Sequence, residues 1–307
     1  MPPFYIPQYH VKELLNMKFK GIMPALVTPL NADETINTQA LDKLMRYLLE
    51  KNSDGFYVGG ATGEGIALKT ENRAVLAEAA VKSSGGKPCI IQVAASDFSD
   101  AIWLAKQAES VGAAAISATA PLFFSYDADD IYNYYKALAN AVHIPLMIYY
   151  NPAAGFNMNA TFAARAFEID NVTAIKWTSS NYYEMMRLKD LTHGEMNIIN
   201  GPDEMLLMGL CAGADGGIGT NYNILMDYIR PIYDHFVAGD LEAAREAQYK
   251  ANRIITVMMG TKIIPAVKVV LEDMGFEVGQ ATFPMKRYTD AEAAQIIKAV
   301  KDAGFEY

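Results

Sequence analysis

Residues 172–200, VTAIKWTSSNYYEMMRLKDLTHGEMNIIN, contain one complete copy of the repeating unit of this chain. Apart from one lysine, their first six residues are apolar or β-branched, a pattern typical of a strand buried on both faces. A helical pattern begins near Asn181, and a second apolar run follows at 196–200. A single lysine, Lys176, interrupts the first strand. The segment therefore predicts a strand–helix–strand unit with a lysine in a buried strand.

The same alternation continues on both sides, at intervals of roughly 25 to 30 residues, which is the size of one βα unit. The predicted strands are GIMPALV, GFYVGG, PCIIQVA, AAAISAT, IPLMIYY, VTAIKW, MNIIN and ADGGIG. Helical patterns start near Thr38, Thr70, Ser96, Asp127, Asn159, Asn181, Asp203 and Asn221. Eight such units with continuous apolar strands favour a closed parallel barrel over an open sheet.

The strands stop after Asp240, and three further helical patterns follow at 241–260, 262–276 and 290–305. No linker or low-complexity segment separates them from the barrel. We predict an α/β fold, a (β/α)8 TIM barrel with three additional C-terminal helices. Its expected parts are an N-terminal arm (1–19), the barrel (20–238) and a C-terminal helical appendage of the same domain (239–307).

Composition limits the class of partner. The chain has 307 residues, of which 51% are hydrophobic, and a formal net charge of -9 that disfavours nucleic acid and anionic lipid. No apolar run reaches the roughly 18 residues of a membrane span, and the start lacks a secretory pattern. Two cysteines give no disulfide framework. We expect a cytoplasmic protein that binds a small molecule, with neither a nucleic-acid nor a membrane partner.

The unusual residues of the predicted barrel gather at one rim. Lys176 closes the sixth strand and Tyr150 the fifth, while loops 59–65, 201–204 and 216–221 lie after or at the end of the second, seventh and eighth strands. Reactive groups of such barrels sit at the C-terminal ends of the strands. The sequence therefore predicts an active site at this rim.

Lys176 is the main catalytic candidate. Burial penalises the ammonium form, and a neutral amine can attack a ketone to form a Schiff base. Tyr150 is the candidate proton shuttle, whereas Tyr149 is expected to be a core residue because neighbouring strand residues point to opposite faces. A structural alternative for Lys176 is an ion pair with Glu64 or Asp203.

The glycine-rich turn and the histidines are the features that bear on a nucleotide or metal site, and neither pattern predicts one. The glycine-rich turn 59–65 can direct backbone N–H groups at an anion, or its glycines can serve only to permit positive φ. It fits neither a Walker loop nor G-x-G-x-x-G, so we predict no nucleotide cofactor. The four histidines are scattered without metal-ligand spacing, so we predict no metal.

Four motifs occur in order: GGATGEG, YYNPAAG, AIKWTSS and ADGGIGTNYN. With them, the chain from Gly21 onward resembles the pyruvate-dependent class I aldolases of the dihydrodipicolinate synthase and N-acetylneuraminate lyase superfamily. The resemblance implies that Lys176 forms the Schiff base with pyruvate and that Tyr150 shuttles protons. It also implies that Ala61 and Thr62 hold the pyruvate carboxylate, and that the protein is a homotetramer.

The segments IKWTSS, NGPDEMLL and GADGGIGTNYN are similar to the lyase branch, in which the corresponding residues contact the hydroxylated tail of sialic acid. Carried over by position, these are Thr178, Gly201, Asp203, Glu204, Gly217 and Thr220. An alternative interpretation of the acidic pair is that it only stabilises a helix N-terminus.

Three departures from the family pattern bear on function. Ala61 replaces a hydroxyl residue, Phe123 stands at or near a tyrosine position, and segment 151–155 is short and lacks the arginine typical of synthases. The last departure argues against a dihydrodipicolinate synthase. The preferred interpretation is a Schiff-base lyase with N-acetylneuraminate as a candidate substrate. Alternatives are a 2-keto-3-deoxy sugar acid aldolase or dehydratase, and a non-catalytic 2-oxo acid binding protein.

Overall fold

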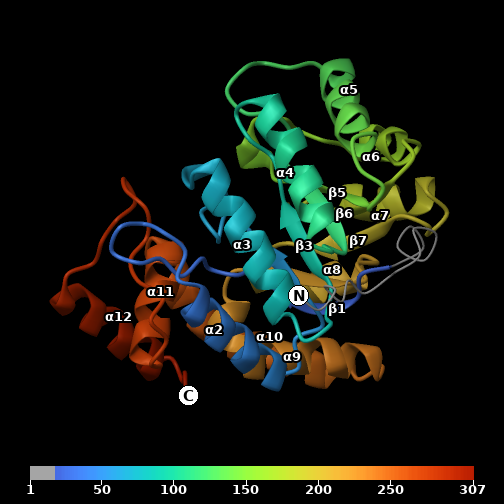
Figure 1. The fold of residues 1–307 in the computed structure, drawn as a ribbon. Coiled ribbons are helices and arrows are strands. Elements are labelled where there is room, and N and C mark those ends of the chain that lie inside the picture. The colour runs from blue at the N-terminus through green and yellow to red at the C-terminus, as the bar shows by residue number, and fades with distance from the viewer. Residues whose placement is uncertain (1–17) are drawn as a thin grey trace.

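Figure 1 shows the fold in a computed structural model, which describes residues 18–307. The strands are β1 (Gly21–Pro24), β2 (Phe56–Val58), β3 (Cys89–Gln92), β4 (Ala115–Ala118), β5 (Leu146–Tyr150), β6 (Val172–Trp177), β7 (Asn197–Asn200) and β8 (Gly216–Gly219). All are parallel, in the order β1-β8-β7-β6-β5-β4-β3-β2. A parallel bridge between Ala25 and Tyr57 joins the two ends. The predicted barrel is confirmed.

Helices follow the strands and form the outer layer. They are α2 (Thr38–Glu50), α3 (Thr70–Ser83), α4 (Phe98–Ser110), α5 (Ala128–Ala139), α6 (Ala160–Phe167), α7 (Tyr182–Leu191), α8 (Leu206–Cys211) and α9 (Tyr222–Val237). The side chains of Asn37, Asp127, Asn159 and Asn181 accept backbone N–H groups at four of these N-termini. Such caps satisfy donors that have no partner within the helix, which explains why these helices begin where the sequence indicated.

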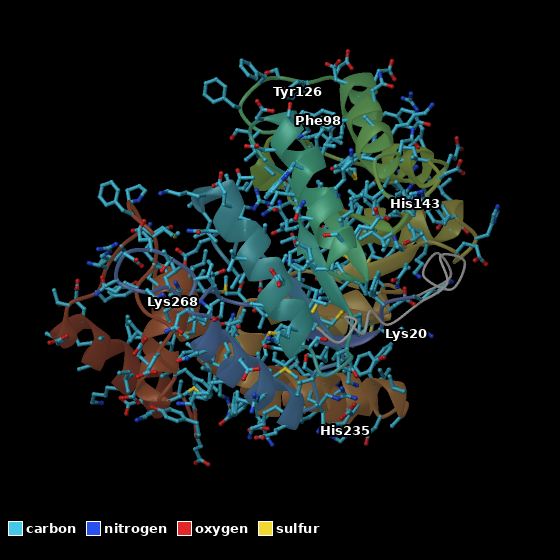
Figure 2. The ribbon with its side chains drawn as sticks, viewed as in Figure 1. Lys20, Phe98, Tyr126, His143, His235 and Lys268 are labelled. Atoms are coloured by element: carbon cyan, nitrogen blue, oxygen red, sulfur yellow. The ribbon has the colours of Figure 1, made fainter. Side chains whose placement is uncertain are left out.

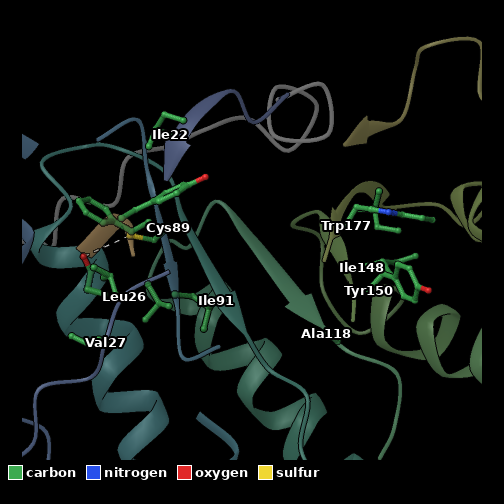
Figure 3. Close-up of a cluster of buried hydrophobic side chains, with 14 of the residues drawn as sticks. Ile22, Leu26, Val27, Cys89, Ile91, Ala118, Ile148, Tyr150 and Trp177 are labelled. Atoms are coloured by element: carbon green, nitrogen blue, oxygen red, sulfur yellow. Dashed lines mark hydrogen bonds between the residues drawn. The ribbon is translucent and has the colours of Figure 1, made fainter. Parts of the chain in front are cut away.

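Apolar side chains fill two separate layers. One layer lies between the strands and the helices, and Figure 3 shows part of it. The other fills the barrel lumen and includes Met23, Tyr57, Met147, Tyr149 and Ala174. Side chains along a strand point alternately to its two faces. Residues two positions away from a lumen residue on the same strand therefore also face the lumen.

The C-terminal part contains α10 (Leu241–Met259), α11 (Ile263–Asp273) and α12 (Asp290–Asp302). In Figure 1, α11 lies next to α2, and α12 packs against α11. Two contacts tie this part to α2: the Lys43 Nζ atom donates to the Gly275 carbonyl at 2.7 Å, and the Tyr47 ring packs on Phe276. The additional helices therefore cover one side of the barrel.

The predicted N-terminal arm lies almost entirely outside the described residues. Its end, Phe19, is buried in the lumen cluster, and its backbone N–H and carbonyl pair with the Asn197 side chain. Among residues 18–307, no single helix meets the length and hydropathy of a membrane span, although α10 and α11 together form one bent pair that does.

Candidate active site

Lys176 projects into the barrel lumen from the end of β6. Its strand neighbour at the same parity, Ala174, belongs to the lumen cluster, and its Cα partners on the flanking strands are Tyr149 and Ile199. The Lys176 side chain is buried, with 5% of the residue exposed. The strand thus places an amine inside the barrel, where it is largely shielded from solvent.

Two tyrosine rings surround this amine. The Lys176 Nζ atom lies 4.6 Å from the centroid of the Tyr57 ring and 4.4 Å from that of Tyr149. Aromatic faces attract a positively charged nitrogen, and a protonated imine carries the same charge as an ammonium. The rings can therefore stabilise the cationic nitrogen of a Schiff base while excluding water.

The ion pairs found within residues 18–307 do not include Lys176. Glu64 instead pairs with Lys268, at 2.7 Å between the Oε1 and Nζ atoms. The Asp203 carboxylate accepts hydrogen bonds from the Asn221 backbone N–H and side-chain amide. Lys176 therefore forms an ion pair with neither Glu64 nor Asp203, the two carboxylates that the structural alternative named.

The structure places the two adjacent tyrosines of β5 on the opposite faces from those expected. Tyr149 lies in the lumen beside Lys176, whereas Tyr150 faces the helix layer, where its ring centroid lies 4.7 Å from that of Trp177 (Figure 3). The Tyr150 Oη atom donates to the Asn157 Oδ1 atom at 2.9 Å, and burial raises the pKa of this phenol. The expectation that Tyr150 and Lys176 meet in the lumen is therefore wrong.

This error has a structural cause. The run IPLMIYY holds two neighbouring tyrosines and no polar residue that would indicate which face is buried in the lumen. The pairing of β5 with β6 also shifts register between Leu146 and Met147, so counting residues along the strands does not reveal the partner of Lys176. Only the completed barrel aligns Tyr149 with Lys176.

Tyr57 is a lumen residue that the sequence analysis did not select. Its Oη atom donates to the Ser117 Oγ atom at 3.0 Å, and its ring meets Tyr149 edge-to-face at 5.9 Å between centroids. Complete burial raises its pKa well above the ordinary value for tyrosine. Its position in the predicted strand GFYVGG, two residues before the glycine turn, was the feature of the sequence that could have identified it.

The glycine turn 59–65 begins next to Tyr57. A Cβ atom at Gly60 would come within 2.5 Å of the Tyr57 ring, so only glycine fits there without movement. Thr62 is buried, and its hydroxyl lies 2.7 Å from that of Thr220 at the end of β8. The structure thus brings Thr62 and Thr220 together, while Ala61 supplies no hydroxyl.

Asp203 is buried at the start of a short 3-10 helix (Asp203–Met205) that follows β7. Burial raises the pKa of its carboxyl group to about 6, although the hydrogen bonds from Asn221 and the charge of Lys176 act in the opposite direction. These hydrogen bonds go to one carboxylate oxygen, Oδ2. Glu204 is half-buried, and its carbonyl accepts a hydrogen bond from the Asn252 side chain. The acidic pair is thus joined both to the β8 loop and to α10.

The remaining predicted tail contacts have different surroundings. The Thr178 Oγ1 atom is buried without a hydrogen-bond partner, and it lies where a Cβ atom at Gly201 would be. A Cβ atom at Gly217 would point toward the Tyr222 hydroxyl and Leu206, within the helix layer and away from the lumen. Gly217 is therefore not part of the proposed site.

Fold and site together define a closed (β/α)8 barrel with a lumen lysine at the end of its sixth strand. The sequence profile of the Dihydrodipicolinate synthetase family matches residues 18–303, and the chain belongs to this family. The predicted resemblance is confirmed.

Relatives of this chain carry a more specific name. It is 33% identical over 285 residues to the N-acetylneuraminate lyase of Rhizobium meliloti, covering 92% of this chain and 95% of that protein. It is 32% identical to the enzyme of that name from Clostridium perfringens, covering 94% and 99%. The Proteus mirabilis N-acetylneuraminate lyase structure is 29% identical, with a TM-score of 0.90 and coverage of 94% and 100%. These similarities agree with the predicted lyase branch.

Proposed function

We propose that this protein is a Schiff-base lyase that cleaves, or reversibly forms, a carbon–carbon bond between pyruvate and an aldehyde. Its candidate substrates are N-acetylneuraminate and related 2-oxo sugar acids, because its relatives are named N-acetylneuraminate lyase. The observation that carries the proposal is a buried lumen lysine that stands between two tyrosine rings and forms no ion pair within residues 18–307.

In the proposed reaction, the Lys176 amine attacks the C2 ketone, and loss of water with uptake of one proton leaves a protonated imine. The 4-hydroxyl of the substrate then loses its proton, and the C3–C4 bond breaks to release an aldehyde. The electrons of that bond form the C2–C3 double bond of an enamine and neutralise the nitrogen. Protonation at C3 and hydrolysis of the imine by water release pyruvate and restore the amine.

We assign the proton transfer to Tyr149 because it is the lumen tyrosine of β5 that adjoins Lys176. Its phenol accepts the 4-hydroxyl proton as it passes its own proton to the substrate carboxylate or to water. We assign the substrate carboxylate to the turn at Ala61 and Thr62, where a hydroxyl and backbone N–H groups can donate to it.

The hydroxylated tail is assigned to Thr178, Gly201, Asp203, Glu204 and Thr220. One observation favours the second candidate, a lyase for shorter 2-keto-3-deoxy sugar acids: Asn221 already donates twice to one oxygen of Asp203. Fewer acceptor positions then remain for the hydroxyl groups of a long substrate. Pyruvate release from a panel of 2-oxo sugar acids of increasing length distinguishes the two.

The subunit arrangement is proposed from an exposed aromatic cluster, which we define as Phe123, Phe124 and Tyr126 in the loop after β4. Phe123 is 95% exposed and Phe124 is 68% exposed, and the Phe124 ring meets those of Phe123 and Tyr126 edge-to-face. Figure 2 shows Tyr126 at the edge of the molecule, near Phe98. Large exposed apolar patches mark interaction sites, so a second copy of this chain is the expected cover, within a homotetramer in the cytoplasm.

The test of the reaction class is trapping of the imine. Pyruvate with a borohydride reductant should add one reduced pyruvate unit to the chain, and peptide mapping should find it on Lys176. The Lys176→Met variant is the control and should gain none. An adduct on another lysine, or no adduct on the native protein, would overturn the proposed mechanism.

A further inference from the structure

A buried ion pair joins the glycine turn 59–65 to the C-terminal appendage. The Glu64 and Lys268 side chains lie 2.7 Å apart, with exposed fractions of 0% and 2%. Figure 2 shows Lys268 in the C-terminal part of the molecule, on α11. Ordinary packing does not require such a pair, because removing two charges from water carries a large desolvation penalty.

Both partners make further hydrogen bonds to the segment after α11. The Glu64 Oε2 atom accepts the Thr282 backbone N–H at 2.6 Å, and the Lys268 Nζ atom donates to the Gln280 carbonyl at 3.0 Å. Burial lowers the pKa of Lys268, while the charge of Glu64 acts to raise it. The carboxylate thus joins the turn, α11 and segment 280–282 in one buried network.

Glu64 also adopts a backbone conformation that needs support. Its φ of 59° lies in the left-handed region, which residues with side chains rarely adopt because it is strained for them. The buried network supplies a fixed partner for the side chain in this conformation. The end of the turn is therefore held from outside the barrel.

The middle of the turn is held from inside the barrel. Thr62 shares a hydrogen bond with Thr220, and the Thr28 hydroxyl donates to the Gly63 carbonyl at 2.6 Å. Thr62 and Glu64 are only two residues apart, so a shift at Glu64 moves the group assigned to the substrate carboxylate. Displacements of about 1 Å far from the reacting atoms can lower rates roughly 10²-fold.

We propose that the Glu64–Lys268 pair is a positioning device, through which the C-terminal appendage holds the turn 59–65 in the shape that binds the substrate carboxylate. This inference rests on the proposed function for its consequence in binding. The anchoring itself is a property of the free protein.

The experiment uses the full-length double variant Glu64→Gln/Lys268→Met, because removing one partner alone would leave an unpaired buried charge. Hydrogen exchange of the free protein should accelerate about 10-fold or more in peptides covering 59–65, with little change in β6. The KM for a cleaved 2-oxo sugar acid should rise about 10- to 100-fold, with kcat changed less than 3-fold.

A matched control loosens the same appendage without touching Glu64. Lys301→Met/Asp273→Asn removes the ion pair between α12 and α11 and should leave turn exchange and KM unchanged. Glu64→Asp keeps the charge but retracts the carboxylate, and it should reproduce the KM effect if the double variant does not fold.

The outcomes separate this inference from the proposed function. A folded double variant, or Glu64→Asp variant, with native turn exchange or native KM would overturn the positioning role. Absence of a pyruvate imine on the native protein would instead overturn the proposed function. Faster turn exchange in the double variant would still support the anchoring.

Discussion

Tyr149 and Lys176 are direct Cα partners on β5 and β6, and the lysine amine lies 4.4 Å from the centroid of the tyrosine ring. Parallel pairing at this register sends both side chains into the lumen, since partners in adjacent strands share a face. The neighbouring pair, Tyr150 and Trp177, points into the helix layer by the same rule. A lumen amine beside a tyrosine phenol provides the two kinds of group that imine chemistry needs.

The two tyrosines give a matched pair of variants. Tyr149→Phe should slow cleavage roughly 10²–10⁴-fold, the usual range for a positioned general acid or base, while imine trapping persists. Tyr150→Phe removes the hydrogen bond to Asn157, outside the lumen, and should cost about 1 kcal/mol of stability with near-native turnover. Single-turnover kinetics and thermal unfolding measure both. Native turnover in Tyr149→Phe together with loss of activity in Tyr150→Phe would reverse the assignment.

The hydroxyl pair of Thr62 and Thr220 is tested by a double-mutant cycle. Thr62→Val should raise KM about 10-fold, because it removes a donor from the site assigned to the substrate carboxylate. Thr220→Val should have a smaller effect alone and little additional effect in the Thr62→Val background. Fully additive losses would mean that the two hydroxyls act independently, contrary to their 2.7 Å contact.

The raised pKa of Asp203 predicts that the stability of the protein depends on pH. Its pKa is raised from an ordinary value of 3.8 to about 6, so the folded state binds the proton more tightly than the unfolded state. Its contribution favours folding below pH 4 and is lost as pH rises through 6. The Asp203→Asn variant should therefore gain roughly 2–3 kcal/mol relative to the native protein between pH 4 and pH 7.

Denaturant unfolding of both proteins at several pH values measures this difference. The amide of asparagine still accepts the hydrogen bonds of Asn221, so the comparison isolates the charge. A difference that stays constant over this pH range, or that shifts toward the native protein, would contradict the raised pKa.

The exposed aromatic cluster predicts the behaviour of the assembly. Light scattering should find an oligomer for the native protein, and Phe123→Asp/Phe124→Asp should reduce its mass, because two charges cannot be buried in an apolar contact. Lys298→Ala, on the exposed face of α12, is the control and should leave the mass unchanged. A double variant that keeps the native mass would place the interface elsewhere.

Local sequence patterns were sufficient to predict the barrel and the position of its lysine. Helices begin at or next to Thr38, Asp127 and Asn159 because capping and periodic burial are encoded within a few residues. The eight strands are likewise apolar runs of strand length, and Lys176 stands out within its own strand. These features need no knowledge of what the segment later touches.

The completed tertiary structure decided which side chains share the lumen and which charges pair. Tyr149 rather than Tyr150 adjoins Lys176 because strand register, including the shift at Leu146, fixes which face of β5 turns inward. Glu64 pairs with Lys268, far along the chain, so no local pattern could reveal its partner. Side-chain orientation and buried charge pairing depend on contacts between distant segments, and such contacts exist only once the barrel has closed and the appendage has packed against it.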